Sequence, residues 1–363
     1  MMVDDELQQV LARAASQPQT SESGGRAWLV YGAGSTGRAW ATALAGSGRT
    51  VHGFIDRRAN SSGSLPVYRP DECTASMKQE CDLLLALHNP GVDVAEVRAE
   101  LLRDGWRKVW LLQQLVAAWP ERSHFWLAPA NETLPFADDA RAAHTLLADE
   151  ASRALFTALL DQRLNGAAER LPPPDPANAY LPPDLSLPAA PLRFVDCGAY
   201  TGDTVESFRR HGLRFDAIAA FEPDPAHFLK LCATLAGERA SVFPCGVWDG
   251  VTQLRFTAND AASHITDQGE ATVQTVALDQ ALPNFAPSFI KMDIEGAEPQ
   301  ALAGARQLIE RYRPRLAISA YHRPRHLWDL LLQVQRWDLR YRFHLRSHSF
   351  NGFDTVLYAL PAP

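Results

Sequence analysis

The chain has 363 residues, roughly twice the length of one typical domain, so its length predicts two domains or one large one. Apolar residues make up 46% and charged residues 21%, which excludes a wholly disordered or fibrous protein. The net charge of −7 provides no basic field for nucleic acid, and no apolar run approaches the ~18 residues of a membrane span. The acidic start lacks the basic and apolar regions of a signal peptide, so we expect a cytoplasmic protein without nucleic-acid or membrane partners.

The first part of the chain is a polar segment followed by alternating strand and helix patterns. Residues 1–25 end in a turn-rich stretch, which predicts a short helix and a flexible N-terminal lead-in. Predicted strands then lie at 27–31, 51–55, 82–87 and 108–112, with predicted helices at 38–46 and 94–102. Strands that alternate with helices form parallel sheets, so residues 26–125 are predicted to be a doubly wound, Rossmann-like nucleotide-binding domain.

Residues 126–190 interrupt this alternation. Leucines and alanines recur at helical spacing between 135 and 164, and proline clusters follow at 171–176 and 181–184. Because such a proline density does not fit helices or central strands, we expect a helical and proline-rich connector between two domains.

Residues 191–363 return to strands and helices. Predicted parallel strands lie at 194–197, 217–221, 241–245, 288–292 and 316–319. Two β-like stretches, 253–257 and 272–277, predict an antiparallel excursion, and 339–345 with 355–360 predict a closing hairpin. The fold class is therefore expected to be α/β, with two doubly wound domains of which the second has a mixed sheet.

A glycine-rich turn follows the first predicted strand. The stretch Gly32-Ala33-Gly34-Ser35-Thr36-Gly37 fits G-x-G-x-x-G, in which glycines permit a tight turn, a close phosphate and close packing of helix and strand. Asp56 ends the second predicted strand, 19 residues after Gly37, where a carboxylate can accept hydrogen bonds from ribose hydroxyls. The predicted N-terminal nucleotide site comprises Gly32, Gly34, Ser35, Thr36, Gly37 and Asp56. The segment 51–56 resembles the nucleotide-binding domains attached to some sugar-modifying enzymes, and it stays open whether the site takes NAD, a nucleotide sugar or no ligand.

The second predicted domain opens with a glycine turn that an acidic residue precedes. Asp196 would repel a diphosphate but attract the ammonium group of an amino acid, and S-adenosylmethionine carries such a group. Glu222 ends the next predicted strand, where it can bind a ribose, and Trp248 follows the third, where it would border an adenine. The predicted cofactor-binding residues are Asp196, Gly198, Ala199, Tyr200, Gly202, Thr204, Glu222, Pro223, Trp248 and Asp293.

The most distinctive block of the chain is Lys291-Met292-Asp293-Ile294-Glu295-Gly296-Ala297-Glu298. A buried strand here delivers three carboxylates around a glycine turn at the carboxyl edge of the sheet, where ligands bind in open α/β folds. Together with the turn at 196–204, Phe221-Glu222-Pro223, Arg346-Ser347-His348-Ser349 and residues 354–358, this block resembles the FkbM-type methyltransferases. The resemblance covers residues 191–360 and implies a class I fold with a seven-stranded sheet, S-adenosylmethionine as methyl donor and usually a hydroxyl oxygen as acceptor.

His322, Asp293 and Glu295 are the predicted catalytic residues. Methyl transfer to an alcohol needs alignment and a base, and His322 follows the fifth strand with a side chain that titrates near neutral pH. The sequence departs from the family in one place: Ala320 stands two residues before His322, where the family often has Glu, so a Glu–His pair is not carried over. We expect no metal, because the five cysteines form no C-x-x-C pair and the carboxylates and histidines match no compact ligand motif.

These patterns predict an enzyme that moves a methyl group from S-adenosylmethionine to a hydroxyl oxygen of a sugar, a nucleotide sugar or a similar small metabolite. Two alternatives stay open: an NAD-dependent oxidoreductase or epimerase acting on a nucleotide sugar, and a non-catalytic nucleotide-binding sensor. The charges of Asp196, Glu222 and Asp293 favour the enzyme, since a site without catalytic function has no need of three carboxylates.

Overall fold

A computed structural model describes residues 2–16, 25–58, 64–186, 189, 191–257, 264–265 and 271–362 of the chain. The contacts between residues divide it into two compact units. The first unit comprises Met1–Asp138, Ala154–Pro174 and Ser349–Phe353, and the second comprises Asp139–Arg153, Asp175–His348 and Asp354–Pro363. The units are interleaved, because the chain passes from one to the other after residues 138, 153, 174, 348 and 353.

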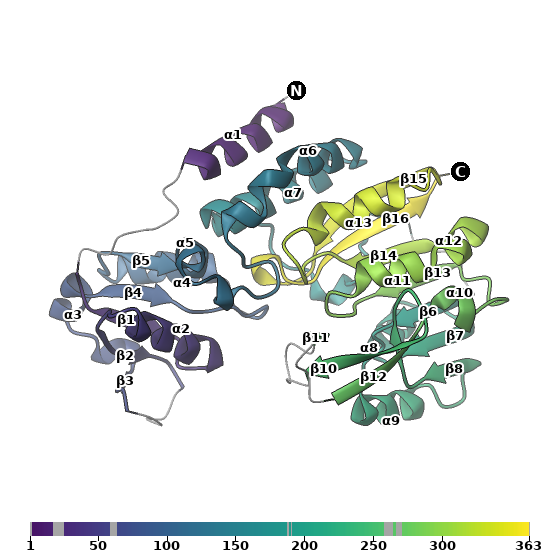
Figure 1. The fold of residues 1–363 in the computed structure, drawn as a ribbon, viewed down its shortest axis with the longest axis horizontal. Coiled ribbons are helices and arrows are strands. Elements are labelled where there is room, and N and C mark those ends of the chain that lie inside the picture. Colours follow the sequence, from purple (N-terminus) through teal and green to yellow (C-terminus); the bar gives the residue numbers. More distant parts are fainter. Residues whose placement is uncertain are drawn as a thin grey trace. The chain divides into compact units, whose positions relative to one another are not determined.

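The first unit contains a five-stranded sheet in which all paired strands are parallel (Figure 1). Its strands, in the order β3-β2-β1-β4-β5, are β1 (Trp28–Tyr31), β2 (Val51–Ile55), β3 (Val67–Tyr68), β4 (Asp82–Leu85) and β5 (Val109–Leu111). Every residue of β1, β4 and β5 is buried, which explains why apolar runs reveal these strands. The predicted parallel sheet is confirmed. The prediction does not include β3, because a strand of two residues is too short to show an alternating apolar pattern.

The first unit also contains helices. They are α1 (Met2–Ser16), α2 (Ser35–Gly46), α3 (Ala75–Glu80), α4 (Val94–Arg103), α5 (Leu112–Leu115) and most of α7 (Glu150–Asn165). The chain also forms short 3₁₀ helices, namely η1 (Pro70–Glu72), η2 (Val116–Ala118), η3 (Pro120–Arg122), η4 (Ala130–Glu132), η5 (Leu134–Phe136), η6 (Ala168–Arg170), η7 (Pro176–Asn178) and η8 (Phe350–Gly352).

α1 occupies the start of the segment predicted to be a short helix with a flexible lead-in. It buries Leu7, Val10 and Leu11, and Arg13 Nη2 lies 2.6 Å from Asp161 Oδ1 of α7. The N-terminal helix is therefore confirmed as a packed element of the first unit, and the rest of the lead-in, residues 17–24, lies outside the described residues.

The C-terminal segment of the first unit is held by Asn351. Its Oδ1 accepts a hydrogen bond from the Val94 N–H at 3.2 Å, and its Nδ2 donates to the backbone oxygens of Asn89 and Val92 at 2.9 and 2.7 Å. Gln162 Nε2 donates to the Asn351 carbonyl at 2.8 Å. Asn351 thus hydrogen-bonds to the loop before α4 and to the first residue of that helix.

The second unit contains the predicted seven-stranded mixed sheet. Its strands, in the order β15-β16-β14-β13-β6-β7-β8, are β6 (Leu192–Cys197), β7 (Phe215–Phe221), β8 (Ala240–Phe243), β13 (Phe289–Met292), β14 (Arg315–Ser319), β15 (Tyr341–Ser347) and β16 (Thr355–Pro361). β16 is antiparallel to both of its neighbours, which confirms the closing hairpin, and the pairs among the remaining strands are parallel.

Helices also flank this sheet. They are α6 (Ala137–Leu146), α8 (Asp203–Arg210), α9 (Pro225–Thr234), α10 (Leu278–Ala281), α11 (Glu298–Gly304), α12 (Arg306–Tyr312) and α13 (His326–Gln335). Phe208 of α8 and Leu231 of α9 join Phe194 and Phe289 of the sheet in one buried apolar cluster. Burial of these side chains packs α8 and α9 against the sheet.

The predicted antiparallel excursion is a separate small sheet. Its strands, in the order β11-β10-β12-β9, are β9 (Gly246–Val247), β10 (Thr252–Thr257), β11 (His264–Ile265) and β12 (Ala271–Val276). β10 and β12 are antiparallel, as expected from the two β-like stretches.

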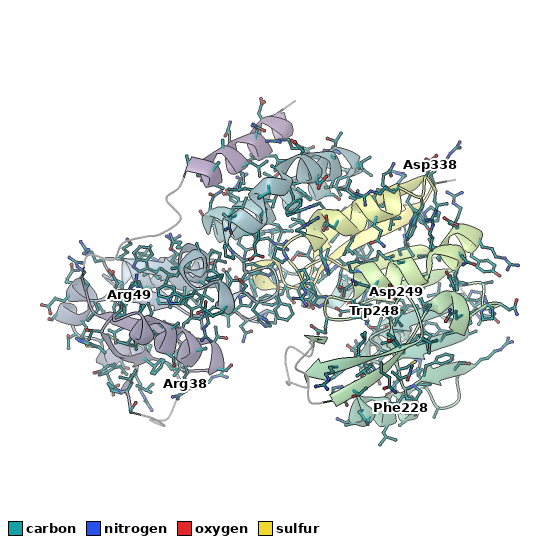
Figure 2. The ribbon with its side chains drawn as sticks, viewed as in Figure 1. Arg38, Arg49, Phe228, Trp248, Asp249 and Asp338 are labelled. Carbon is teal, nitrogen blue, oxygen red and sulfur yellow. The ribbon has the colours of Figure 1, made fainter. Side chains whose placement is uncertain are left out.

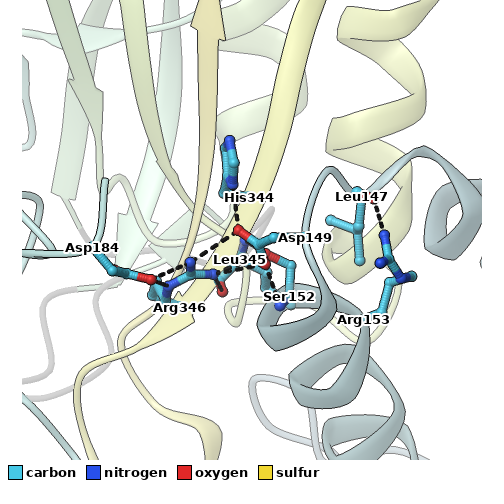
Figure 3. A network of polar contacts seen from close by, with 8 residues as sticks. All are labelled: Leu147, Asp149, Ser152, Arg153, Asp184, His344, Leu345 and Arg346. Atoms are coloured by element: carbon cyan, nitrogen blue, oxygen red, sulfur yellow. Dashed lines mark hydrogen bonds and ion pairs between the residues drawn. The ribbon is translucent and has the colours of Figure 1, made fainter. Parts of the chain in front are cut away.

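Polar contacts fix the edge strand β15 within the second unit (Figure 3). Arg346 Nη2 lies 3.0 Å from Asp149 Oδ2, and Arg346 Nε donates to Asp184 Oδ2 at 2.9 Å. His344 Nδ1 lies 2.6 Å from the same Asp149 oxygen. Asp149 and Asp184 both precede residue 191, so the sheet depends on parts of the chain that come before its first strand.

Candidate active site

The ends of β6, β7, β13 and β14 meet at one edge of the seven-stranded sheet, because these strands are parallel neighbours. Gly198 follows β6 with φ +74°, and a Cβ there would lie 2.0 Å from the backbone oxygen of Asp293. Gly202 begins α8 with φ +91°, and a Cβ there would lie 2.7 Å from Thr234 Cγ2. Both positions require glycine, and the glycine turn lies directly against the Lys291–Glu298 block.

Glu222, at the end of β7, holds this turn through both carboxylate oxygens. Oε2 accepts a hydrogen bond from the Tyr200 N–H and Oε1 accepts one from the Asp224 N–H, each at 2.8 Å. Burial raises the pKa of Glu222, although these hydrogen bonds oppose the shift. The carboxylate lies at the strand end beside the glycine turn.

Asp196 is fully buried and faces Lys291, its register partner on the neighbouring strand β13. Lys291 Nζ lies 3.1 Å from Asp196 Oδ1 and donates to the Gly198 carbonyl at 2.7 Å. Burial alone would lower the pKa of Lys291, but the charge of Asp196 raises it above its ordinary value. This ion pair fixes the glycine turn from within the sheet, and direct attraction of a cofactor ammonium group by Asp196 stays a prediction.

Asp293 follows β13 and lies between the glycine turn and His322. Its Oδ2 accepts a hydrogen bond from the Tyr180 hydroxyl at 2.9 Å, and its Oδ1 lies 3.4 Å from His322 Nε2. Within the described part of the chain, Oδ1 is buried and accepts no hydrogen bond. A buried carboxylate oxygen without a donor is costly, and a cationic amino group would satisfy it.

His322 lies among carboxylates. Its Nδ1 is 2.8 Å from Glu298 Oε1, and its Nε2 is 3.4 Å from Asp293 Oδ1 and 3.5 Å from Glu295 Oε2. Burial alone would lower the pKa of His322, but the charge and hydrogen bond of Glu298 raise it to about 9. Burial likewise would raise the pKa of Glu298, but its contacts with His322 and His326 lower it well below the ordinary range. A Glu–His pair is therefore present, with Glu298 on α11 as the partner in place of a residue just before His322.

Glu295 lies in the glycine turn after β13 with a left-handed backbone (φ +56°). Its side chain is 40% exposed. Burial of the carboxyl group raises its pKa to about 7, and the charge of His322 opposes this shift. The three predicted catalytic residues thus lie together, on the exit of β13 and the exit of β14.

The remaining predicted cofactor-binding residues lie around the glycine turn and beyond β7. Ala199 and Thr204 are buried, Tyr200 is 50% exposed with its ring 4.2 Å from that of His227, and Pro223 is half-buried. Trp248, which Figure 2 labels, follows β9, and its backbone N–H donates to the Val276 carbonyl at 2.9 Å. A Cβ at Gly304 of α11 would lie 2.1 Å from the Trp248 carbonyl, so this strand exit is packed on α11.

The first unit contains the other predicted site, the glycine turn between β1 and α2. A Cβ at Gly37 would lie 1.8 Å from the Gly32 carbonyl, whereas a Cβ at Gly34 would meet no atom within 4 Å. Asp56 Oδ2 accepts a hydrogen bond from the Ala33 N–H and Oδ1 accepts one from the Arg58 N–H, each at 2.8 Å. Ser35 and Thr36 form the first turn of α2 beside Arg38, which Figure 2 labels. The predicted residues Gly32, Gly34, Ser35, Thr36, Gly37 and Asp56 therefore surround one turn.

Three site residues escape the sequence interpretation. Lys291 pairs with Asp196 across adjacent strands, and only the strand order reveals this register. Glu298 is part of the distinctive block, but its pairing with His322 joins residues 24 positions apart. Tyr180 lies in the proline-rich stretch, where no local pattern marks a contact with Asp293, 113 residues later.

Two classes of feature are missing from the described residues. Residues 2–16, 25–58, 64–186, 189, 191–257, 264–265 and 271–362 contain no group of three or more His, Cys, Asp and Glu side chains arranged to hold a metal ion. Within the same part of the chain, no helix is long and apolar enough to cross a membrane.

Two comparisons with known proteins found a similar domain and a similar fold. The sequence profile described as "Methyltransferase FkbM domain" matches residues 196–345. The crystal structure of methyltransferase FkbM from Methylobacillus flagellatus KT is similar to 98% of this chain and 99% of its own, with 20% identity and a TM-score of 0.78. This likeness shows that the two chains share a fold over their whole length. No curated protein matches the chain.

A more distant structure is that of Aeropyrum pernix fibrillarin with natively bound S-adenosyl-L-methionine. It is similar to 51% of this chain and 73% of its own, with 13% identity, and its TM-score of 0.31 is too low to support a conclusion. The profile match and the mixed seven-stranded sheet indicate a methyltransferase domain without this structure. Residues 196–345 therefore match the methyltransferase domain of the FkbM family, a family of S-adenosylmethionine-dependent enzymes.

Proposed function

We propose that the protein transfers a methyl group from S-adenosylmethionine to a hydroxyl oxygen of a sugar, a nucleotide sugar or a similar small metabolite. The observation that carries this proposal is the Glu298–His322 pair, which presents His322 Nε2 beside Asp293 and Glu295 at the ligand-binding edge of the sheet. An imidazole held through Nδ1 by a carboxylate is well suited to take a proton at Nε2.

The cofactor-binding residues are proposed to surround the glycine turn. Glu222 would accept hydrogen bonds from the ribose, and Trp248 would border the adenine. The buried Oδ1 of Asp293, which accepts no hydrogen bond in the described part of the chain, would accept the ammonium group. Gly198, Ala199, Tyr200, Gly202, Thr204 and Pro223 would shape the turn, and Asp196 would support it through Lys291.

S-adenosylmethionine supplies an electrophilic methyl group on a sulfonium sulfur. His322 Nε2 would take the hydroxyl proton while the acceptor oxygen bonds to the methyl carbon and the carbon–sulfur bond breaks, which leaves S-adenosylhomocysteine. Glu298 at Nδ1 would stabilise the imidazolium. Glu295, with its half-exposed carboxylate, would hold the acceptor hydroxyl beside Nε2.

Calorimetric titration with S-adenosylmethionine tests the cofactor first. We expect saturable binding that an Asp293→Asn, Glu222→Gln double variant loses. Formation of S-adenosylhomocysteine with a panel of sugars and nucleotide sugars then tests the acceptor, and NMR of the product identifies the methylated atom. Methylation of nitrogen, or turnover that His322→Asn leaves unchanged, would overturn the proposal.

We infer further that the glycine turn of the first unit binds a nucleotide or a nucleotide sugar. Asp56 has the same two backbone partners as Glu222, one in the glycine turn and one two residues downstream, so the two turns are built alike. The open space beside Gly34 would admit a phosphate.

Titration with NAD and with UDP-glucose tests this second site. Gly34→Ala fills the open space and is expected to weaken binding at least tenfold, whereas Gly46→Ala, at the other end of α2, has equal space and should bind normally. Equal binding by both variants, or no binding by the native protein, would contradict a nucleotide site. A change in nicotinamide absorbance with a nucleotide sugar would favour the oxidoreductase alternative.

A further inference from the structure

The methyltransferase site receives one residue from outside the part of the chain that matches the family. Tyr180 precedes residue 196, yet its hydroxyl donates to Asp293 Oδ2 at 2.9 Å. The opposite oxygen of the same carboxylate lies 3.4 Å from His322 Nε2. The Tyr180 hydroxyl therefore holds Asp293 in the orientation that brings it to His322.

The segment that carries Tyr180 is fixed at both of its ends. The Tyr180 N–H donates to the Tyr358 hydroxyl oxygen at 3.1 Å, and His348 Nε2 lies 2.8 Å from that hydroxyl. His348 Nδ1 lies 2.9 Å from the Asp175 carbonyl. Burial lowers the pKa of His348, so its neutral ring can donate from Nδ1 to Asp175 and accept the Tyr358 proton at Nε2. One Tyr–His pair thus secures residues 175 and 180 to β16 and to the end of β15.

The ring of Tyr180 makes a second contact with the glycine turn. Lys291 Nζ lies 5.5 Å from the ring centroid, while the same ammonium group pairs with Asp196 and donates to the Gly198 carbonyl. A cation at this distance is attracted to the aromatic face. The ring and the hydroxyl of Tyr180 therefore contact two charged groups of the site: Lys291, which pairs with Asp196, and Asp293.

We propose that Tyr180 is a positioning residue of the methyltransferase site, which aligns Asp293 for the ammonium group of S-adenosylmethionine. This inference rests on the proposed role of Asp293 in cofactor binding. It also assigns a role to residues 175–180, which hold the tyrosine over the exit of β13 and belong to neither the predicted catalytic nor the predicted cofactor-binding set.

The test is a double-mutant cycle on the full chain, with calorimetric titration by S-adenosylmethionine. Tyr180→Phe removes only the hydroxyl and keeps the ring, so we expect binding about tenfold weaker than that of the native protein, as for loss of a hydrogen bond to a charged group. In the Asp293→Asn background the same substitution should change affinity less than twofold, because the charged carboxylate that Tyr180 is proposed to orient is no longer present.

Tyr341→Phe is the matched control. Tyr341 is also buried in the second unit, and its hydroxyl makes a single hydrogen bond, to the Pro314 carbonyl at 2.7 Å, away from the glycine turn. Its loss should leave the affinity for S-adenosylmethionine unchanged. NMR provides a second measurement, since Tyr180→Phe should shift the imidazole signals of His322 and Tyr341→Phe should not.

The outcomes separate this inference from the proposed function. If the native protein binds S-adenosylmethionine and Asp293→Asn weakens binding while Tyr180→Phe does not, the role of Tyr180 is overturned and the cofactor assignment stands. Additive effects in the cycle would also overturn it. If Tyr180→Phe does not fold, Tyr358→Phe provides a second test, because it removes the hydroxyl that binds the Tyr180 N–H and keeps the Tyr180 hydroxyl. We expect Tyr358→Phe to weaken S-adenosylmethionine binding severalfold. Unchanged binding would overturn the inference. Failure of the native protein to bind would overturn the proposed function itself.

Discussion

His322 shows how a single side chain is tuned by its neighbours. A buried histidine ordinarily becomes easier to deprotonate, yet Glu298 on Nδ1 outweighs burial and brings the pKa to about 9. We predict that NMR titration of the imidazole gives a midpoint near pH 9 in the native protein. Glu298→Gln removes the charge and should lower this midpoint by at least one unit, whereas Glu310→Gln, on the exposed end of α12, should leave it in place. A native midpoint at or below 6.5 would contradict the pairing.

The same titration predicts the pH dependence of turnover. Only the deprotonated ring can accept the hydroxyl proton, so the rate should rise with pH and level off near pH 9. The competing base is Glu295, whose pKa of about 7 would make the rate level off near neutrality. The measurement is the rate of S-adenosylhomocysteine formation from pH 6 to 10. A rise in rate that levels off near pH 7 in the native protein and is absent in Glu295→Gln would show that Glu295 is the base.

Asn351 stabilises the first unit through contacts with residues far away in the sequence, which no local pattern predicts. It is 7% exposed, adopts φ +61° and satisfies three backbone groups of residues 89–94. Asn351→Gly keeps the backbone conformation but leaves these groups without partners, and should cost about 2–4 kcal/mol of unfolding free energy. Asn351→Ala should cost about 1 kcal/mol more, since alanine disfavours a left-handed backbone. Urea denaturation measures both, and variants as stable as the native protein would contradict the role of Asn351.

Elements differ in how well the sequence predicts them. β2 occupies the predicted residues 51–55, and β13 and β14 begin within one residue of the predicted starts. Every residue of β13 and β14 is buried, whereas β2 is buried only from Gly53 to Ile55. The ends of the parallel strands that carry the predicted site side chains lie at one edge of the sheet. Which of them touch is not predictable, since the Asp196–Lys291 and Glu298–His322 contacts depend on strand order and helix placement that no local pattern encodes.

The packing of α2 on its glycine turn allows a prediction at the scale of one element. Alanine is a better helix former than glycine by about 1 kcal/mol, so Gly37→Ala would stabilise an isolated helix. In the protein a Cβ at Gly37 would lie 1.8 Å from the Gly32 carbonyl, and the overlap should destabilise the first unit by about 2–3 kcal/mol. Gly46→Ala, in the same helix with open space around it, should change stability by less than about 0.5 kcal/mol. Equal thermal midpoints for the two variants would rule out the close packing.

At the scale of the whole molecule, the second unit draws on segments that precede the sheet. A fragment of residues 191–363 lacks Asp149 and Asp184, and Arg346 then loses both carboxylate partners. We predict that this fragment has a lower thermal midpoint than the full chain and binds S-adenosylmethionine more weakly, because Tyr180 is missing as well. Addition of residues 139–190 to the fragment should restore part of the binding. A fragment that binds as tightly as the full chain would show that these segments are dispensable.

The interleaving of the two units also constrains the order in which they can fold during synthesis. A ribosome releases the chain from its N-terminus, and domains generally fold as they emerge. Ser349–Phe353 belong to the first unit but follow residues 175–348 of the second, so the backbone groups of Val94, Asn89 and Val92 lack their partner until that long segment has been made. The first unit therefore reaches its final structure only after most of the methyltransferase sheet has been made.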